Sequence, residues 1–156
     1  MRVLWFAQHE VPAALLAQMV ALQDQAWPRG AGEAWTDHDP ALHPETMMLV
    51  DDRSVVLASL AILSKVITHD GRHFAASGLS TVVTDRAHRG RGYGHRLVTA
   101  ARERIAEGGA DLGIFSCDRP LAGFYRRAGW RVLPGTVLIG GTPDDPLPSD
   151  RFDKVV

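Results

Sequence analysis

Residues 82–96 read VVTDRAHRGRGYGHR, an apolar strand that runs through a glycine-rich turn into the start of a helix. Gly90, Gly92 and Gly94 let the backbone approach a ligand without interference from Cβ atoms. The free N–H groups at a helix N-terminus, with the helix dipole behind them, attract phosphate. Arginines beside the turn add bidentate phosphate donors. The stretch therefore predicts a binding site for a phosphate or a pyrophosphate.

Two common phosphate-binding loops do not fit this stretch. A P-loop ends in Gly-Lys-Ser or Gly-Lys-Thr, whereas this turn ends in Gly94-His95-Arg96. A dinucleotide fingerprint has the spacing G-x-G-x-x-G within repeated β-α-β units, whereas the spacing here is G-x-G-x-G. On the glycines alone, a turn that binds no ligand is the alternative.

The flanking sequence predicts a mixed α/β fold of the α+β type. Asp70-Gly71 lies between two apolar runs and predicts a hairpin, because type I′ turns need positive φ. Gly78, inside the second run, predicts a bulge or a close backbone approach. The first four strands can run antiparallel, and the crossover over residues 82–116 predicts a parallel pair. The expected helices are Val11–Trp27, His95–Glu107 and one that opens at Asp118 and ends at Gly129. A Pro- and Asp-rich tail ends the sequence. The expected strands are Val3–Phe6, Thr46–Val50, Val55–Thr68, Phe74–Thr84, Asp111–Cys117, Trp130–Leu133 and Thr136–Gly140.

Composition narrows the class of protein. The 156 residues, 46% of them hydrophobic, predict one domain over 1–156. Seventeen Lys+Arg against eighteen Asp+Glu give a net charge of −1, which argues against a nucleic-acid or polybasic membrane partner. The single cysteine, Cys117, fits a reducing compartment. No stretch approaches the ~18 apolar residues of a membrane span, and the first apolar run is too short for a signal peptide. We expect a cytoplasmic protein.

Two motifs together resemble the GNAT superfamily of N-acetyltransferases. Arg89-x-x-Gly92-x-Gly94 resembles the loop that binds the pyrophosphate of acetyl-CoA in that family. Phe124-Tyr125-Arg126-Arg127-Ala128-Gly129-Trp130 resembles the family's aromatic-Tyr-x-x-x-Gly-aromatic segment. The resemblance implies a mainly antiparallel central sheet flanked by helices, with a bulge that splays a parallel strand pair, and an acetyl-CoA-binding core at about 74–133.

The resemblance also implies residues that hold acetyl-CoA as co-substrate. Val82, Val83 and Thr84 would pair with the pantetheine arm, and residues 89–95 would wrap the pyrophosphate. Arg86 and Arg91 are candidates for the 3′-phosphate, and Ser116 and Asp118 for the pantetheine tail. The expected cofactor-binding residues are therefore Val82, Val83, Thr84, Arg89, Gly90, Arg91, Gly92, Tyr93, Gly94, His95 and Ser116.

Tyr125 is the expected catalytic residue. A phenol, with a reference pKa near ~10, can give a proton to a departing thiolate, whose reference pKa is near ~8.5. Tyr125 shares a helix face with Leu121, Phe124 and Ala128, so a plain core aromatic is the alternative. The general base is not evident. Many family members carry a glutamate on the strand before the loop, whereas residues 76–81 here read ASGLST. Ser77 or Ser80 could hold a water instead, and Glu33, Asp37 or His38 could relay a proton.

The hairpin with Gly78, the segment 111–116 and the segment 142–145 are similar to aminoglycoside 2′-N-acetyltransferases. Those enzymes bind polycationic sugars with acids, which suits Glu33 and Asp37, and with Ser80 these form the expected substrate-binding set. Two departures stand against this similarity: Ser80 takes the place of the strand glutamate, and the sequence ends soon after Asp145.

The sequence therefore predicts an N-acetyltransferase that acts on the primary amine of a small molecule by direct attack on the thioester. A non-catalytic acyl-CoA-binding module and an acetyltransferase for a protein or peptide amine are the alternatives. We expect no metal, because His69 and His73 flank a turn and no Cys pair exists. Cys117 is expected to be a structural thiol rather than a nucleophile. Exposed strands near the end of the sequence make a homodimer an expectation.

Overall fold

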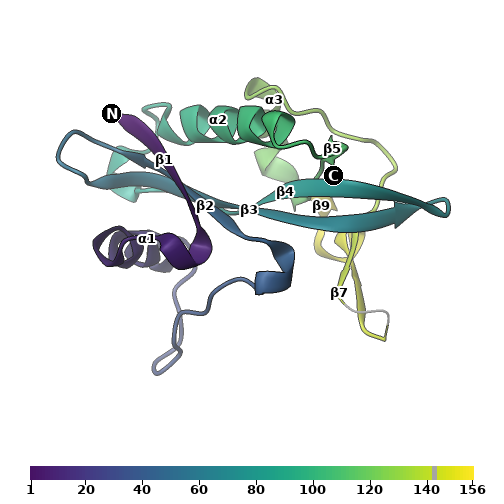
Figure 1. The fold of residues 1–156 in the computed structure, drawn as a ribbon, viewed down its shortest axis with the longest axis horizontal. Helices are drawn as coiled ribbons and strands as arrows, with labels where there is room; N and C mark the ends of the chain where they lie inside the picture. The colour runs from purple at the N-terminus through teal and green to yellow at the C-terminus, as the bar shows by residue number, and fades with distance from the viewer. Residues whose placement is uncertain (142–143) are drawn as a thin grey trace.

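The computed structural model describes residues 1–141 and 144–156, and its centre is a five-stranded sheet (Figure 1). The strand order is β1 (Arg2–Ala7), β2 (Glu45–Val50), β3 (Val56–His69), β4 (Arg72–Thr84) and β5 (Leu112–Gly113). The first four strands pair antiparallel, whereas β5 runs parallel to β4. The predicted mixed and mainly antiparallel sheet is confirmed.

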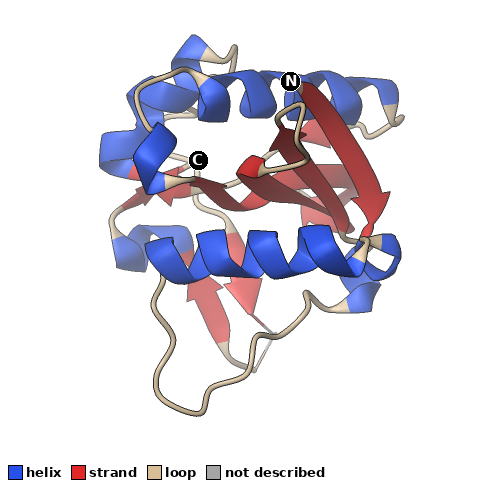
Figure 2. Cartoon of the chain, turned by 90° about the vertical axis from the view of Figure 1, so that its left-hand side faces the viewer, coloured by secondary structure: helices blue, strands red, loops and turns tan. Residues whose placement is uncertain are grey.

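Two helices cover opposite faces of this sheet (Figure 2). On one face α1 (Ala13–Ala26) packs Met19 and Leu22 against buried residues of β2 and β4. On the other face α2 (Tyr93–Glu107) packs Leu97 and Val98 into a second core with residues of β2, β3 and β4. The short helix α3 (Ala122–Arg127) joins this second core. Single 3₁₀ turns lie at Gln8–Glu10 (η1), Pro40–Leu42 (η2), Arg86–His88 (η3), Arg119–Leu121 (η4) and Ser149–Phe152 (η5).

The β3–β4 hairpin confirms the turn read from Asp70-Gly71. Both residues have positive φ, 47° and 71°, as a type I′ turn requires. Near the other end of β4 the register shifts: Ala61 lies opposite Ser80, but Ser59 lies opposite Val83. One extra residue of β4 is thus inserted in a bulge, and Thr81 there has φ +48°.

Strands β4 and β5 pair only briefly and then separate. The ladder joins Ala76 to Leu112 and Ser77 to Gly113, and Ile114 N donates to Ser77 O at 2.8 Å. A Cβ atom on Gly78 would lie 2.3 Å from Ile114 O, so the close approach expected at this glycine is confirmed. The single strand predicted over Asp111–Cys117 is wrong at residues 114–116, because the two strands diverge there.

The later part of the chain differs most from the expected elements. The strand predicted at Trp130–Leu133 is absent. Instead Trp130 packs edge-on against Phe115, and Leu133 N donates to Val156 O. The strand expected over Thr136–Gly140 is the short β7 (Ile139–Gly141), paired with β8 (Pro146–Pro148). The expected tail contributes β9 (Lys154–Val155), which pairs with β6 (Cys117–Asp118). Of the segment 142–145, which is similar to aminoglycoside 2′-N-acetyltransferases, residues 142 and 143 lie outside the described residues.

Candidate active site

A cleft of ≈ 860 Å³ opens at the end of the sheet where β4 passes into α2. Its walls come from the last three residues of β4, the glycine-rich turn, the first turn of α2, the end of α1 and one face of α3. The crossover therefore brings the two sequence motifs, which are about thirty residues apart, into one cleft.

The glycine-rich turn presents a row of free donors to this cleft. Gly90 and Gly92 have φ +76° and +80°, and Gly92 is the N-cap of α2. The first intrahelical bond runs from Arg96 N to Gly92 O. Within the described chain, the N–H groups of residues 89–95 donate to no protein acceptor. This is the arrangement that binds an anion at a helix N-terminus.

The segment before the glycines is fixed in place. The Asp85 carboxylate caps η3, accepts from Ala87 N at 3.3 Å and contacts Nδ1 of His88 at 2.6 Å. The bond with His88 lowers the pKa of Asp85. Arg86 donates from its guanidinium to Gln25 O at the end of α1. These contacts hold the turn open toward the cleft without a ligand.

Tyr125 lies at the inner wall of the cleft, 8% exposed. Its ring makes edge-on contacts with Phe115 and Phe124, with centroids 4.9 and 5.0 Å away. Burial, with smaller contributions from Cys117 and Asp118, raises the pKa of Tyr125 to about 12. Within the described residues, the Tyr125 hydroxyl has no hydrogen-bond partner. The group therefore keeps its proton at neutral pH and has it free to donate.

A neighbouring contact fixes the helix that carries Tyr125. Nε2 of His95, in the first turn of α2, lies 2.9 Å from Arg127 O at the end of α3. The distance between the glycine-rich turn and Tyr125 is thereby set by a direct link between their helices.

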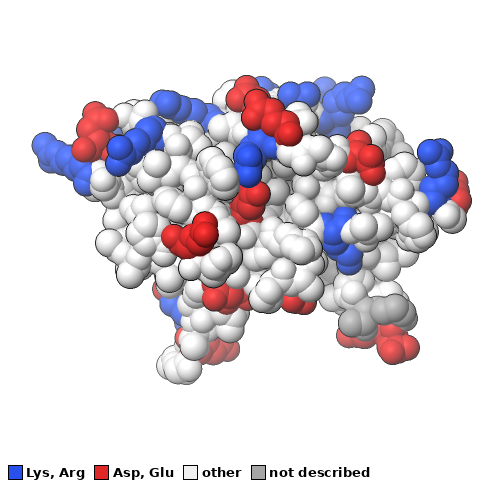
Figure 3. All heavy atoms as spheres, viewed as in Figure 1, with Lys and Arg blue, Asp and Glu red and all other residues white. Residues whose placement is uncertain are grey.

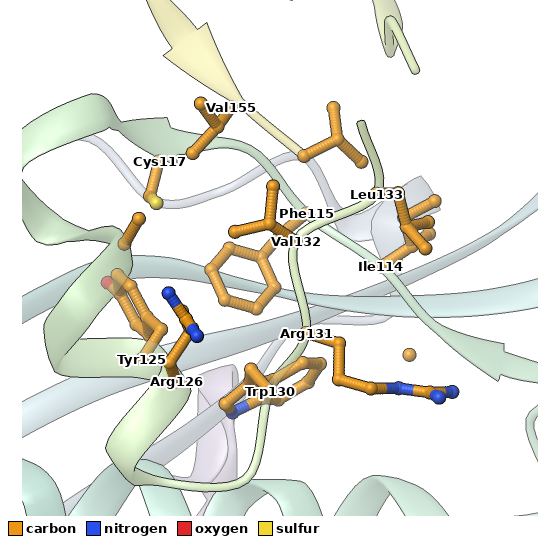
Figure 4. A pocket seen from close by; sticks show the side chains of 13 residues that line it. Ile114, Phe115, Cys117, Tyr125, Arg126, Trp130, Arg131, Val132, Leu133 and Val155 are labelled. Carbon is orange, nitrogen blue, oxygen red and sulfur yellow. The ribbon is translucent and has the colours of Figure 1, made fainter. Parts of the chain in front are cut away.

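Behind Tyr125 lies a smaller apolar pocket of ≈ 50 Å³, enclosed by α3, β6, β9 and residues 130–133 (Figure 4). Figure 4 shows the oxygen of Tyr125 at the end of its ring that points away from Trp130. Cys117 also lines this pocket, and burial raises the pKa of its thiol. A protonated thiol is a poor nucleophile, which agrees with a structural role.

A small cavity of ≈ 40 Å³ lies beside the bulge of β4, and Thr81, His38 and Gln8 are among its lining residues. The Gln8 side chain holds the His38 backbone through two 3.0 Å bonds, one donated to His38 O and one accepted from His38 N. Burial lowers the pKa of His38, so its imidazole is neutral at pH 7. The Thr81 hydroxyl is buried and unpartnered among the described residues. The cavity is large and polar enough for a water, which the imidazole could deprotonate.

On the face shown in Figure 3, most basic side chains lie along the upper part of the molecule with acidic ones among them, and further acidic side chains lie at the ends of the two segments that hang below the sheet. In the described ranges, no cluster of three or more His, Cys, Asp or Glu could hold a metal ion. None of the described helices is long and apolar enough to cross a membrane.

A family model for the acetyltransferase (GNAT) domain matches residues 8–133. The chain belongs to the GNAT acetyltransferase family. No curated protein matches its sequence.

Solved structures with the same fold include the following three. Glucosamine-6-phosphate N-acetyltransferase from Arabidopsis thaliana has a TM-score of 0.66 and 14% identity, over 92% of this chain and 100% of that one. ElaA from Escherichia coli has a TM-score of 0.66 and 15% identity, over 99% and 95%. An aminoglycoside acetyltransferase from an uncultured soil metagenomic sample has a TM-score of 0.67 and 14% identity, over 90% and 95%. At these identities the likeness shows the GNAT fold.

Most of the residues matched to the GNAT motifs line one cleft. These are Val82, Val83, Thr84, Arg89, Gly90, Gly92, Tyr93, Gly94, His95 and Tyr125. Arg91 does not line this cleft, and Ser116 lines a different groove. Glu33 and Asp37 lie on the exposed loop after α1, where Glu33 accepts from Gly30 N. Ser80 is half-buried, just before the bulge.

Among the wall residues of the cleft that the sequence interpretation missed are Trp27, Phe124 and Arg127. Phe124 and Arg127 stand on either side of Tyr125 in the second motif, so their helical spacing gave a usable indication. Trp27 follows the last residue of α1, and it lies at the cleft because of how that helix packs on the sheet. No local sequence pattern indicates this packing.

Proposed function

We propose that this chain transfers the acetyl group of acetyl-CoA to the primary amine of a small molecule, by direct attack of the amine on the thioester. One observation carries the proposal: the glycine-rich turn, with its free donors, and Tyr125, whose hydroxyl has no partner among the described residues, line the same cleft. The first group fits a pyrophosphate, and the second fits a leaving group that needs a proton.

The residues present fit the co-substrate. Arg89 and the N–H groups of residues 89–95 would hold its pyrophosphate, and Arg86 and Arg127 add positive charge at the same wall. Beyond the bulge, the edge of β4 at residues 82–84 is free of β5 and offers backbone groups to an extended arm. When bound, acetyl-CoA supplies an activated acetyl thioester.

The chain's own residues must move one proton for each acetyl group. The amine loses a proton as the C–N bond forms, and the sulfur gains one as the C–S bond breaks. We assign the donated proton to the Tyr125 hydroxyl and the removal of the amine proton to water in the cavity shared by Thr81 and His38. Backbone N–H groups of the bulged strand can stabilise the oxyanion that forms between these steps. The single cysteine and the charge of −1 support a cytoplasmic enzyme with a soluble acceptor.

Replacing Tyr125 by Phe tests this function. Loss of a general acid typically costs about 10²–10⁴ in rate, so we expect turnover to fall by at least about a hundredfold while acetyl-CoA affinity stays unchanged. Trp5→Phe, on the exposed side of β1, is the control for an aromatic change remote from the cleft. Unchanged turnover in Tyr125→Phe contradicts the assignment of the acid.

One observation favours a second function, a module that binds acyl-CoA without catalysis. Residues 76–81 carry no carboxylate to serve as base. In that case calorimetry detects acetyl-CoA binding, no amine releases thiol, and Tyr125→Phe changes neither result.

A further inference from the structure

A second depression is a groove of ≈ 380 Å³ between the β3–β4 hairpin and the segments that Figure 1 draws below the sheet, on the side of α1. Its roof is the distal half of the β3–β4 hairpin. Its walls are η2 on one side and the β7–β8 hairpin with η5 on the other. No residue matched to the acetyl-CoA loop lines it.

The groove and the cleft lie next to each other along β4, near the fork between β4 and β5. On β4, residues 76–79 line the groove and residues 82–84 line the cleft, so only Ser80 and Thr81 lie between them on that strand. On the segment that follows β5, residues 114–116 line the groove and Asp118 lines the cleft, with Cys117 between them. Leu79 and Val82 are three positions apart, roughly 10 Å at the rise of a strand. A molecule in the groove can therefore reach one in the cleft.

Most of the residues that line the groove are apolar, and the charged ones are both lysines. Leu42, Leu63, Ile67, Ile139, Leu147 and Phe152 are among its lining residues. The Ser77 hydroxyl bonds that of Ser64 at 2.7 Å, so it is not free for a ligand. Of the described lining residues only Lys65 and Lys154 are charged, and Lys154 pairs with Asp118 at 2.6 Å. Lys65 is exposed and has no ion pair in the described part of the chain.

We propose, on the basis of the function proposed above, that this groove holds the acceptor, and that the acceptor is an ω-amino carboxylate with an apolar body. Its amine lies at the fork, and its carboxylate pairs with Lys65. Lys65 lies opposite Ala76, four positions before Ser80, so its backbone lies roughly 13 Å along the strand from the fork, a distance shared by the acceptor and the Lys65 side chain. The volume is near the lower end of small-ligand sites. A polycationic sugar meets no carboxylate in this groove and is repelled by Lys65.

A matched series of amines tests the acceptor class. The probes are 8-aminooctanoate, octylamine and 1,8-diaminooctane, which share one chain length and differ only at the far end. Thiol release from acetyl-CoA is measured with each, and kanamycin is added as a polycation. We expect kcat/KM to fall from the carboxylate to the alkylamine to the diamine, with kanamycin lowest.

Variants of Lys65 assign the carboxylate contact. Lys65→Met keeps an apolar stem and should reduce the preference for 8-aminooctanoate over octylamine by about two- to fivefold, the range of an exposed ion pair. Lys65→Glu should place the diamine above the carboxylate. Arg53→Glu, on the exposed turn between β2 and β3, is the control and should leave the order unchanged.

The outcomes separate this inference from the proposed function. If acetyl-CoA binds and the diamine or kanamycin is the best acceptor, the acceptor class is wrong although the transferase stands. If acetyl-CoA binds and none of the probes releases thiol, the acceptor assignment is again overturned, and thiol release with any other amine then separates a wrong acceptor class from a module without catalysis. If acetyl-CoA does not bind, the proposed function itself fails. A dimer that Ile139→Ser dissociates, with acceptor order unchanged, shows that a second copy covers the groove instead.

Discussion

Replacing Gly78 by Ala perturbs the point at which β4 and β5 separate. An alanine Cβ would lie 2.3 Å from Ile114 O and 3.2 Å from the Cβ of Phe115. The ordinary C···O contact is roughly 3.3 Å, so the two strands must move apart by about 1 Å. Neither group can rotate away, because the nearest atom belongs to the backbone.

The expected cost follows from the contacts that this movement weakens. Overpacking in a filled site costs about 1–3 kcal/mol. The 2.8 Å bond from Ile114 N to Ser77 O adds about 0.5–1.5 kcal/mol if it is lost. The intrinsic preference for Ala over Gly in a strand returns about 0.5–1 kcal/mol. We therefore expect the free energy of unfolding to fall by about 2–3 kcal/mol.

Urea unfolding measures this change. With an m-value of about 1–3 kcal/mol/M, the midpoint should fall by about 1–2 M. Gly123→Ala in α3 is the matched control: its Cβ would meet only a guanidinium nitrogen of Arg127 at 3.7 Å, and the variant should be slightly more stable. If Gly78→Ala unfolds at the wild-type midpoint, Ile114 is not held against β4 and the reasoning about the fork is wrong.

Two further predictions concern the cleft. Gly92→Asp should weaken acetyl-CoA binding at least tenfold, because it places a negative charge where the pyrophosphate would bind. The loss of stability should be small: the φ of +80° is strained for Asp, but no atom lies within 4 Å of the new Cβ. Gly32→Asp, which has φ +87° and equal space on a loop outside the cleft, is the control in the same calorimetric titration. Because burial raises the pKa of Tyr125 to about 12, turnover should not fall between pH 7 and 10, and the stability due to burying the neutral phenol should be lost only from pH 10 upward. An alkaline limb between pH 7 and 10 that Tyr125→Phe removes would contradict the raised pKa of Tyr125.

Local patterns predicted the parts of the fold that local chemistry determines. Asp70-Gly71 specified a two-residue turn, and the register of β3 with β4 followed from it. The close approach at Gly78 was predicted because a glycine in a strand interior has few other reasons to be there. The glycine-rich turn was predicted because Gly90, Gly92 and Gly94 stand between an apolar run and the start of an amphipathic helix.

The missed features depend on contacts between distant residues. Residues 130–133 have the composition of a strand, but β9 occupies the edge of β6 and Val156 binds Leu133. The bulge places Thr81, a β-branched residue, at positive φ, which no propensity predicts. Ser116 lies within the strand predicted over Asp111–Cys117, yet the divergence of β4 and β5 places it in the groove.

Because β4 carries one inserted residue at the bulge near Thr81, the number of residues in β4 decides which face of the sheet its last residues occupy. Side chains alternate along a strand, so one residue removed there would turn Val82, Val83 and Thr84 over. Val83 would leave the core under α1, and the turn that follows would start from the opposite face of the sheet. Substitutions in β4 can accumulate gradually, whereas a single-codon deletion between Ser80 and Val83 would end cofactor binding and packing together. At the exposed turn of Asp70 and Gly71, an added residue can lengthen the loop while the strand pairs beyond it are kept. Among descendants of this sequence, we expect insertions and deletions at that turn and none at the bulge.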